Sequence, residues 1–370
     1  MTQIVSGVKV AIDRGGTFTD VIAVIPGQED YVFKLLSVDP LNYKDANVEA
    51  IRRTLEHITG YHIEKGKLLD TSSISSIRLG TTVATNALLE RKGARCALLT
   101  TAGFKDILKI GDQARPDLFA MHIHKPEVLY EEVVEIQERV TAPDYDEDPD
   151  NVKFKHTVGQ DRKKFKTGRT GQIYEILKPL DLEDARTKLL GLKEKGIESV
   201  GICLVHGYNF TEHESILKEL VKELNFKFVT ASYELMPMIR AIPRAQSVVV
   251  EAYLTPIIKD YIASFLSGFA KDFEKTTKIE FMQSDGGLVP YHEFSGLRAL
   301  LSGPAGGVVG EARTCYDANE GTPIVGFDMG GTSTDVSRYD GNYEYVFHSI
   351  TAGVHVAAPQ LDINTVAAGG

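Results

Sequence analysis

The feature that most constrains this chain is a short motif that it contains twice. Residues 11–21 read AIDRGGTFTDV and residues 326–336 read GFDMGGTSTDV, so the pattern Asp-x-Gly-Gly-Thr-x-Thr-Asp-Val occurs near both ends of the sequence. In each copy one β-rich run leads into the glycine pair and another follows it, which predicts a tight hairpin. A repeat with such a wide separation indicates duplicated domains rather than a solenoid.

The similarity continues beyond the two motifs. The tripeptide YVF occurs at residues 31–33 after the first motif and at residues 345–347 after the second. We therefore expect each copy to be a unit of three consecutive strands, with this tripeptide in the third strand.

The residue types in the motif suit a turn that binds phosphate. Adjacent glycines leave the backbone N–H groups uncovered, so that they can form a concavity for an anion, and threonine hydroxyls add further donors. We predict that two such turns face each other and hold the phosphates of a nucleotide. A hairpin kept only for its fold is the alternative, but it does not explain why the aspartates and threonines recur as well. The predicted phosphate-binding residues are Gly15, Gly16, Thr17, Thr19, Gly330, Gly331, Thr332 and Thr334.

The aspartates of the motif would repel a phosphate unless a cation lay between them. Mg²⁺ fits this position, since it binds one or two carboxylates together with phosphate oxygens and water. We predict that Asp13 and Asp328 hold Mg²⁺, directly or through water. Asp20 and Asp335 either orient the hairpins or act as a base, and the sequence leaves this choice open. These four aspartates are the candidate catalytic residues.

Length and patterning predict an α/β protein of two domains. The chain has 370 residues, of which 43% are hydrophobic, and β-rich runs alternate with stretches of helical periodicity such as 42–60 and 246–273. We place a first domain at residues 1–231, with the first motif, and a second at 232–370, with the second motif. Too few residues follow the second motif for a domain of typical size, so we expect the second domain to be truncated.

One segment interrupts the alternation of strands and helices. Residues 141–179 are acidic and proline-bearing at first, then basic and polar. We interpret them as a variable excursion from the first domain or a mobile loop, although so long a structureless segment is unusual in a compact domain.

Composition and missing motifs narrow the class of protein. The 41 Lys and Arg against 51 Asp and Glu give a net charge of −10, which argues against general nucleic-acid binding. No apolar run reaches the roughly 18 residues of a membrane span, and no secretory signal is visible. The three cysteines are scattered, as in a reducing compartment. We expect a cytoplasmic protein that binds neither nucleic acid nor membrane, and we find no P-loop, nucleophile elbow or zinc-site spacing.

A few further residues are candidates for the substrate site, each with a structural alternative. Thr81 and Thr82 lie at a predicted helix start, where they either attract an anion or cap the helix. Arg115 either binds a substrate carboxylate or forms a surface ion pair, and Arg244 offers the same two choices. Asp285 precedes two glycines and either forms a turn, which is the expected role, or belongs to the site.

Longer motifs resemble a known family. These are IDRGGTFTDV, KLLSVDPLNYKDA, RLGTTVATNALLERKGAR, GDQARPDLF, MQSDGGLV, LSGPAGGVVG and GFDMGGTSTDVSRYDG. They are similar to the ATP-dependent hydantoinase/oxoprolinase family, and within it to the eukaryotic oxoprolinase branch. The resemblance covers nearly the whole chain, and the paired hairpins also resemble those of the actin and sugar-kinase superfold, which is ribonuclease H-like.

The resemblance implies ATP, Mg²⁺ and a lactam as small-molecule substrate. It implies ATP-dependent hydrolysis of 5-oxo-L-proline to L-glutamate, within glutathione turnover, through phosphorylation of the amide oxygen. It also implies a large C-terminal or hydantoinase B-type region, on the same chain or as a separate subunit, and leaves a homo-oligomer open. Because that region is absent from this sequence, the alternative is a truncated, non-catalytic family member or association module. A small-molecule kinase of the same superfold is a third hypothesis.

Overall fold

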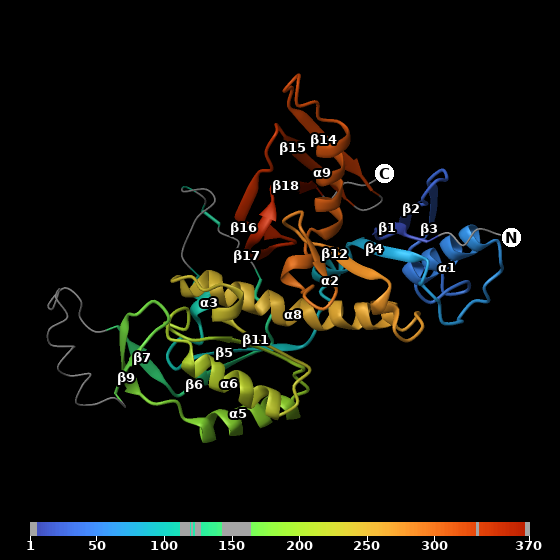
Figure 1. The fold of residues 1–370 in the computed structure, drawn as a ribbon. Helices are drawn as coiled ribbons and strands as arrows, with labels where there is room; N and C mark the ends of the chain where they lie inside the picture. Colours follow the sequence, from blue (N-terminus) through green and yellow to red (C-terminus); the bar gives the residue numbers. More distant parts are fainter. Residues whose placement is uncertain are drawn as a thin grey trace. The chain divides into compact units, whose positions relative to one another are not determined.

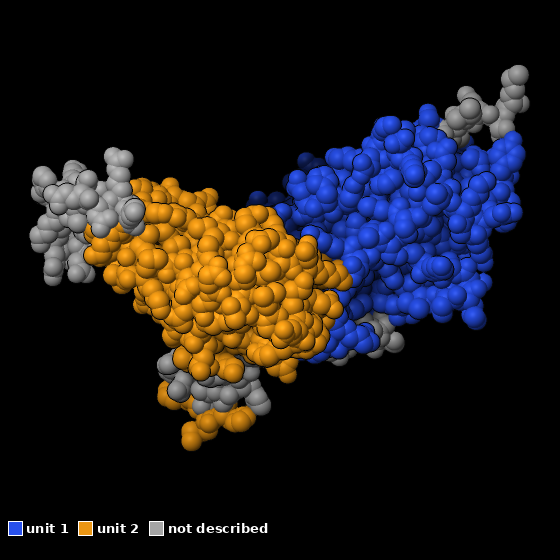
Figure 2. All heavy atoms as spheres, turned by 90° about the horizontal axis from the view of Figure 1, so that it is seen from below, with its two compact units in different colours: residues 1–92, 257–347, 359–370 blue, residues 93–256, 348–358 orange. Residues whose placement is uncertain are grey.

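The computed structural model describes residues 6–111, 119, 121–122, 127–142, 164–330 and 333–366. Strands and helices alternate along the chain (Figure 1). The chain forms two compact units, shown in Figure 2: unit 1 comprises residues 1–92, 257–347 and 359–370, and unit 2 comprises residues 93–256 and 348–358. Both motifs belong to unit 1. The division at residues 231/232, which separates the motifs, remains a sequence-based prediction.

The first motif lies in a six-stranded sheet of unit 1 with strand order β13-β12-β4-β1-β2-β3. The strands are β1 (Val8–Arg14), β2 (Phe18–Val24), β3 (Tyr31–Leu36), β4 (Ile74–Thr81), β12 (Lys278–Met282) and β13 (Leu288–Pro290). Strand β1 is antiparallel to β2 and parallel to β4. Its side chains alternate between buried and exposed, so Val10 and Ile12 enter the core on one face.

Helix α1 (Ala46–Thr59) covers that buried face. Asp45 caps its start by accepting hydrogen bonds from the N–H groups of Asn47 and Val48, and Gly60 ends it with φ 70°. The ring of Tyr31 on β3 stacks on His57 of α1, with ring centroids 3.8 Å apart. The helix expected within residues 42–60 is confirmed.

The second motif lies in a three-stranded sheet of unit 1. It consists of β14 (Ile324–Met329), β15 (Thr334–Tyr339) and β18 (Ile363–Val366), in the order β14-β15-β18. Helix α9 (Ser302–Thr314) packs on one face of this sheet (Figure 1), where Ala305 and Val308 form a cluster with Leu361. The Ser337 hydroxyl donates a hydrogen bond to Glu311 of this helix at 3.2 Å.

The expected third strand of the second copy is present, but it pairs differently from its counterpart in the first copy. The run at 345–347 belongs to β16 (Tyr345–Thr351), which pairs with β17 (Val354–Leu361) instead of β15. The reason is the two-residue turn between them, since Ala352 and Gly353 have φ 51° and 76°, the left-handed values that join a tight hairpin. Strand β18 takes the place beside β15.

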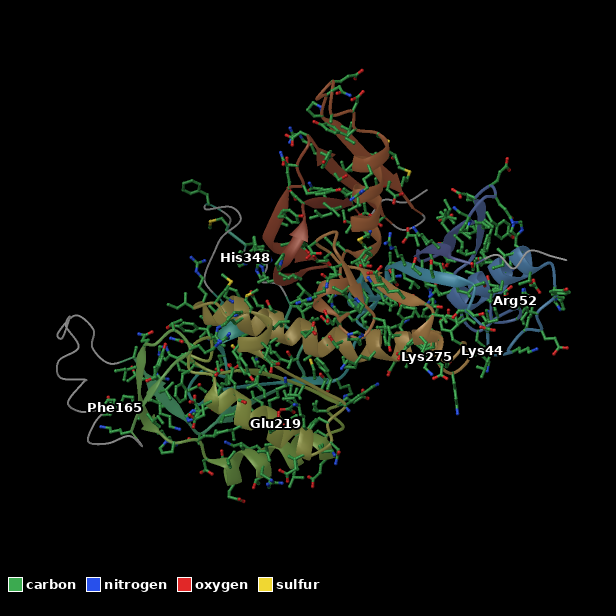
Figure 3. All side chains as sticks on the ribbon, in the orientation of Figure 1. Lys44, Arg52, Phe165, Glu219, Lys275 and His348 are labelled. Atoms are coloured by element: carbon green, nitrogen blue, oxygen red, sulfur yellow. The ribbon has the colours of Figure 1, made fainter. Side chains whose placement is uncertain are left out.

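Unit 2 contains a parallel sheet with strand order β11-β10-β5-β6. Its strands are β5 (Cys96–Thr101), β6 (Glu132–Ile136), β10 (Ser199–Cys203) and β11 (Phe228–Ala231). Helices α5 (Leu182–Glu194) and α6 (Glu212–Glu223) cover one face with an aliphatic cluster that includes Leu189 and Leu217. The polar side of α6 carries Glu219, whose exposed carboxylate pairs with Lys222 (Figure 3).

Helix α8 (Ala241–Leu266) packs on β10 in unit 2 and supplies residues to both units. Gly201 of β10 allows the close approach, because a Cβ there would lie 2.4 Å from Cγ1 of Val248. This is the long helix expected at 246–273, and it begins and ends earlier than expected. Among the described residues, no helix combines the length and the apolar character that crossing a bilayer requires.

The interpretation of residues 141–179 as a loop is wrong for the part that the structure describes. Strands β7 (Arg139–Thr141), β8 (Phe165–Thr167) and β9 (Ile173–Lys178) form an antiparallel sheet in the order β7-β9-β8. Its inner face carries Val140 and Tyr174, which pack with Phe210. The run IYEILK of β9 does carry a strand signal, and the interpretation missed it because residues 141–179 were treated as one polar segment. Residues 143–163 lie outside the described part.

Candidate phosphate-binding site

The two motifs form hairpins with the same backbone geometry. The Gly15 N–H donates to the carbonyl of Phe18 at 3.0 Å, and the Gly330 N–H donates to the carbonyl of Ser333 at 2.9 Å. The strand register places Asp13 opposite Asp20 and, in the second hairpin, Asp328 opposite Asp335. The sequence repeat is therefore a structural repeat. Gly331 and Thr332 lie outside the described residues.

The carboxylates of the two hairpins are close enough for the charge of one to raise the pKa of another. The pKa of Asp13 is raised to about 6, first by burial and then by the charges of Asp20 and Asp328. The Asp13 side chain is in contact with solvent. Enough protein surrounds it, however, for burial to be the main cause of its raised pKa. Burial also raises the pKa of Asp335, a hydrogen bond from Thr365 opposes this effect, and the charge of Asp328 adds to it. A cation between the hairpins would relieve this repulsion.

Two helices begin beside Asp13. The residue opposite Asp13 on β4 is Gly80, where a Cβ would lie only 2.7 Å from the Asp13 carboxylate, so a larger residue would force this carboxylate to move. Gly303 in the first turn of α9 would bring a Cβ to 3.6 Å from the same oxygen. Helix α2 (Val83–Leu89) starts directly after β4, and the Thr81 N–H donates to the Ser302 hydroxyl at 3.2 Å.

Thr81 and Thr82 have local hydrogen-bond partners. The Thr81 hydroxyl accepts from the Val83 N–H at 3.2 Å, which forms a local turn, whereas the N-cap residue Thr82 makes no side-chain capping bond to α2. The Thr82 hydroxyl donates to the carbonyl of Arg14 at 3.3 Å and accepts from the Asn86 amide at 3.2 Å. These bonds connect the start of α2 to the first hairpin. A substrate role for either threonine remains a prediction.

Thr19 stabilises the turn of the first hairpin through a buried hydrogen-bond chain. Its buried hydroxyl is hydrogen-bonded to Ser37 at 2.9 Å, and the Ser37 hydroxyl donates to the carbonyl of Gly15 at 2.8 Å. Ser37, which sequence reasoning missed, also donates its N–H to the carbonyl of Thr17 at 2.9 Å. The missed signal is its position directly after the third strand. Asp20 instead faces solvent and pairs with Lys34 at 3.1 Å.

The other candidate residues from the sequence are Arg115, Arg244 and Asp285. Arg115 lies outside the described residues. Both expectations for Arg244 are wrong: its side chain is fully buried and donates to the Ser232 hydroxyl and the carbonyl of Leu204. Asp285 is confirmed as a turn former, since it accepts the N–H of Gly287 at 2.9 Å.

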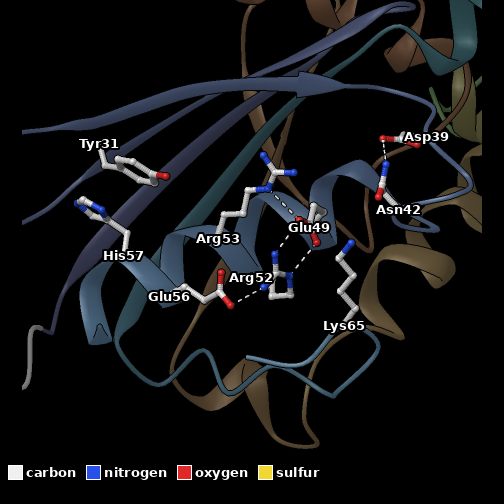
Figure 4. Close-up of a pocket in the computed structure, with 9 residues that line it drawn as sticks. All are labelled: Tyr31, Asp39, Asn42, Glu49, Arg52, Arg53, Glu56, His57 and Lys65. Atoms are coloured by element: carbon white, nitrogen blue, oxygen red, sulfur yellow. Dashed lines mark hydrogen bonds and ion pairs between the residues drawn. The ribbon is translucent and has the colours of Figure 1, made fainter. Parts of the chain in front are cut away.

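Unit 1 also contains a cavity of about 700 Å³ along α1 (Figure 4). Burial alone would raise the pKa of Glu49, but hydrogen bonds from Arg52 and Arg53 outweigh it and lower the pKa. Arg52 also pairs with Glu56 at 2.6 Å. Because these charges pair within α1, the cavity shows no preference for an anion, and we do not assign the phosphates to it. Its lining residues are Tyr31, Asp39, Asn42, Glu49, Arg52, Arg53, Glu56, His57 and Lys65.

The fold and the paired hairpins define a class, the α/β proteins with an actin- and sugar-kinase-like fold. Nucleotide-free acetone carboxylase, studied for ATP-dependent acetone carboxylation, matches with a TM-score of 0.71 and 22% identity over 99% of this chain and 48% of that chain. The ATP-dependent caprolactamase of Pseudomonas jessenii matches with a TM-score of 0.68 and 24% identity over 98% of this chain and 48% of that chain. The expected fold class is confirmed.

Sequence comparison then identifies the family. The model of the hydantoinase/oxoprolinase N-terminal region matches residues 9–225, and the hydantoinase/oxoprolinase model matches residues 244–370. The chain belongs to the hydantoinase/oxoprolinase family. It is 51% identical over 370 residues to 5-oxoprolinase 1 of Arabidopsis thaliana, a match that covers 100% of this chain and 28% of that protein. The chain thus spans little more than a quarter of the length of this curated relative.

The raised pKa of Asp13 predicts a pH effect in the protein without nucleotide or divalent cations. A carboxyl whose pKa rises from 3.8 to about 6 on folding stabilises the fold below pH 4, and this contribution is lost as the pH rises through 6. We therefore expect Asp13→Asn to raise the melting temperature at pH 8, with the gain shrinking toward pH 4. Asp340→Asn, which removes a surface partner of Arg338, is the matched control. An equal effect of Asp13→Asn at both pH values would contradict the prediction.

Proposed function

We propose that this chain is the nucleotide-binding part of an ATP-dependent enzyme that hydrolyses the lactam 5-oxo-L-proline to L-glutamate. The observation that carries the proposal is the pair of equivalent hairpins, whose Asp13 and Asp328 carboxylates interact electrostatically. The 51% identity to 5-oxoprolinase 1 of Arabidopsis thaliana favours this substrate. A cytoplasmic location and a role in glutathione turnover belong to the same proposal.

The proposed reaction explains why ATP is needed. Amide resonance stabilises the lactam carbonyl against attack by water. Transfer of the terminal phosphoryl group of ATP to the lactam oxygen makes the carbonyl carbon electrophilic and releases ADP. Water then adds to this carbon, and the ring C–N bond breaks as the nitrogen takes a proton, which leaves an acyl phosphate. A second water hydrolyses the acyl phosphate to the carboxylate of L-glutamate and inorganic phosphate. In such a transfer the protein mainly positions the groups and neutralises charge.

The residues at the hairpins fit Mg²⁺ as a partner of the nucleotide. Among the described residues, no three His, Cys, Asp or Glu side chains group into a metal site. Asp13 and Asp328 would therefore bind the ion together with phosphate oxygens and water, as is usual for Mg²⁺. The bound ion would neutralise the charge of the phosphates. The N–H groups of the glycine turns would hold the phosphate oxygens, and Asp20 and Asp335 keep the two roles proposed from sequence.

A second candidate function is a non-catalytic family member that associates with a partner. The match covers 28% of 5-oxoprolinase 1, so the given residues correspond to part of that relative. Activity of residues 1–370 alone is therefore a separate question from activity of the complete assembly.

The test uses a chimera in which this chain replaces the matching part of 5-oxoprolinase 1 of Arabidopsis thaliana. We expect 5-oxoproline to stimulate phosphate release from ATP at least tenfold, with one glutamate formed per phosphate. The same assay on residues 1–370 alone decides whether the second candidate describes the isolated chain. A chimera that unfolds cooperatively and yet releases no phosphate would refute the proposal, and a phosphorylated product without ring opening would favour the kinase hypothesis.

A further inference from the structure

Arg14 is the last residue of β1 and follows Asp13 directly. Its partly buried guanidinium lies over the ring of Tyr261 on α8, with Cζ 5.2 Å from the ring centroid. Within the described part of the chain, no carboxylate forms an ion pair with Arg14. Lys34 on β3, by contrast, pairs with Asp20 at 3.1 Å. The positive charge of Arg14 is therefore available to an anionic ligand at the first hairpin.

Contacts on two sides fix the position of Arg14. The amide of Asn47 donates to the Tyr261 hydroxyl at 2.7 Å, which holds the ring against the guanidinium. The carbonyl of Arg14 accepts the Thr82 N–H at 3.1 Å and the Thr82 hydroxyl at 3.3 Å. Because the aromatic ring contacts the face of the guanidinium, the N–H groups at its edge stay available. Such an edge can donate two parallel hydrogen bonds to a carboxylate.

The second hairpin shows that the turn itself does not require an arginine. Arg14 lies opposite Thr19 in the first hairpin, and Met329 lies opposite Thr334 in the second. Both hairpins nevertheless close with the same backbone hydrogen bond at the first glycine of the motif. The fold of the hairpin therefore does not explain why the first copy has an arginine at this position.

Arg14 and Asp13 point to opposite faces of the sheet, because neighbouring side chains on a strand alternate. Arg14 shares its face with the fully buried Thr19 and Thr81, which lie opposite it on β2 and β4. Asp13 shares the other face with Asp20. A cation and phosphates held by Asp13 would thus lie on one side of the strand end and Arg14 on the other. This arrangement favours the second reactant, instead of the nucleotide, as the ligand of Arg14.

We propose that Arg14 binds the carboxylate of 5-oxo-L-proline and thereby selects lactams that carry a carboxylate. The inference rests on the proposed function for the identity of the substrate. This substrate is an anion at neutral pH, and the four aspartates of the two motifs repel it. The guanidinium offsets this repulsion and fixes the orientation of the ring. Thr81 and Thr82, which the sequence predicts as substrate residues, lie next to Arg14 at the start of α2.

The test compares two lactams in the chimera with 5-oxoprolinase 1. One is 5-oxoproline, and the other is 2-pyrrolidinone, which has the same ring without the carboxylate. Arg14→Met should raise the KM for 5-oxoproline roughly 10- to 100-fold, the range expected for lost hydrogen bonds to a charged group. The KM for ATP and the kcat/KM for 2-pyrrolidinone should stay unchanged. A purely structural role would instead alter all three values.

Two further variants serve as controls. Arg14→Lys keeps the charge but loses the paired hydrogen bonds, so it should raise the KM for 5-oxoproline less than Arg14→Met does. Lys9→Met removes an exposed cation from the same strand and should leave the KM for 5-oxoproline unchanged. The melting temperature of each variant is compared with that of the unsubstituted chimera.

Binding without turnover separates this inference from the proposed function. Calorimetry measures the affinity of the chimera for 5-oxoproline in the presence of a non-hydrolysable ATP analogue. A chimera that binds 5-oxoproline more tightly than its Arg14→Met variant, yet releases no phosphate, would refute the proposed function alone. An active chimera in which Arg14→Met leaves the KM for 5-oxoproline unchanged, or raises the KM for ATP instead, would overturn the inference alone. Absence of 5-oxoproline binding to the folded, unsubstituted chimera would overturn both.

Discussion

Asp13→Ala is expected to reduce the phosphate release that 5-oxoproline stimulates in the chimera by a factor on the order of 10³, because groups that neutralise the charge of a transferring phosphoryl group contribute on this scale. The Asp13 carboxylate lies among the charges of Asp20 and Asp328 and at the starts of α2 and α9. It is thus placed to hold a cation against the phosphates. The measurement is the rate of phosphate release at saturating ATP over a range of Mg²⁺ concentrations.

The expected stability of Asp13→Ala allows a loss of phosphate release to be attributed to the missing carboxylate. Loss of the Asp13 carboxylate should stabilise the nucleotide-free fold at neutral pH, since its pKa is raised to about 6. Lost activity would therefore not reflect unfolding. Asp328→Ala should have a similar effect, and the double variant should be little worse than either single one, because the two residues act on one ion. Asp340→Asn should retain activity. Normal activity of Asp13→Ala would refute the metal assignment.

Local sequence was sufficient to predict the hairpins and most helices. The glycine pairs and flanking β-rich runs specify a turn within about ten residues, so both hairpins form as expected. The periodicity and the terminal glycine of the run before Gly60 likewise specify α1. These features depend on neighbours in the sequence, which a single chain reveals.

Features that depend on distant partners were not predictable in the same way. The YVF run at residues 345–347 has the composition of its counterpart, but the turn at Ala352 and Gly353 directs β16 to β17. Gly80 leaves room for the Asp13 carboxylate on the neighbouring strand, a contact that spacing alone does not reveal. The burial of Arg244 likewise depends on Glu214 and Ser232, which lie elsewhere in the sequence.

Arg244→Met is expected to destabilise unit 2 by about 3–5 kcal/mol, the usual cost of removing one partner of a buried ion pair. Both side chains of the pair are fully buried, and Arg244 lies 3.8 Å from the Glu214 carboxylate. That carboxylate accepts hydrogen bonds from the N–H of Leu204 at 2.8 Å, from the Ser232 hydroxyl at 2.8 Å and from the N–H of Tyr233 at 3.2 Å. Without the arginine, a buried negative charge would remain with neutral donors only.

The pH dependence distinguishes this electrostatic effect from lost packing. Burial raises the pKa of Glu214, and removal of Arg244 removes a charge that opposes the rise. A carboxyl with a raised pKa in the folded state favours folding at low pH, and this contribution is lost as the pH increases. The loss in the free energy of unfolding caused by Arg244→Met, measured by urea unfolding, should therefore be smaller at pH 5 than at pH 8.

Adding Glu214→Gln to the Arg244→Met variant should recover part of the lost stability at pH 8. Arg95→Met, which removes the partner of Glu131 at the surface, is the control and should change stability far less. A deficit that is independent of pH would assign the role of Arg244 to packing rather than to charge.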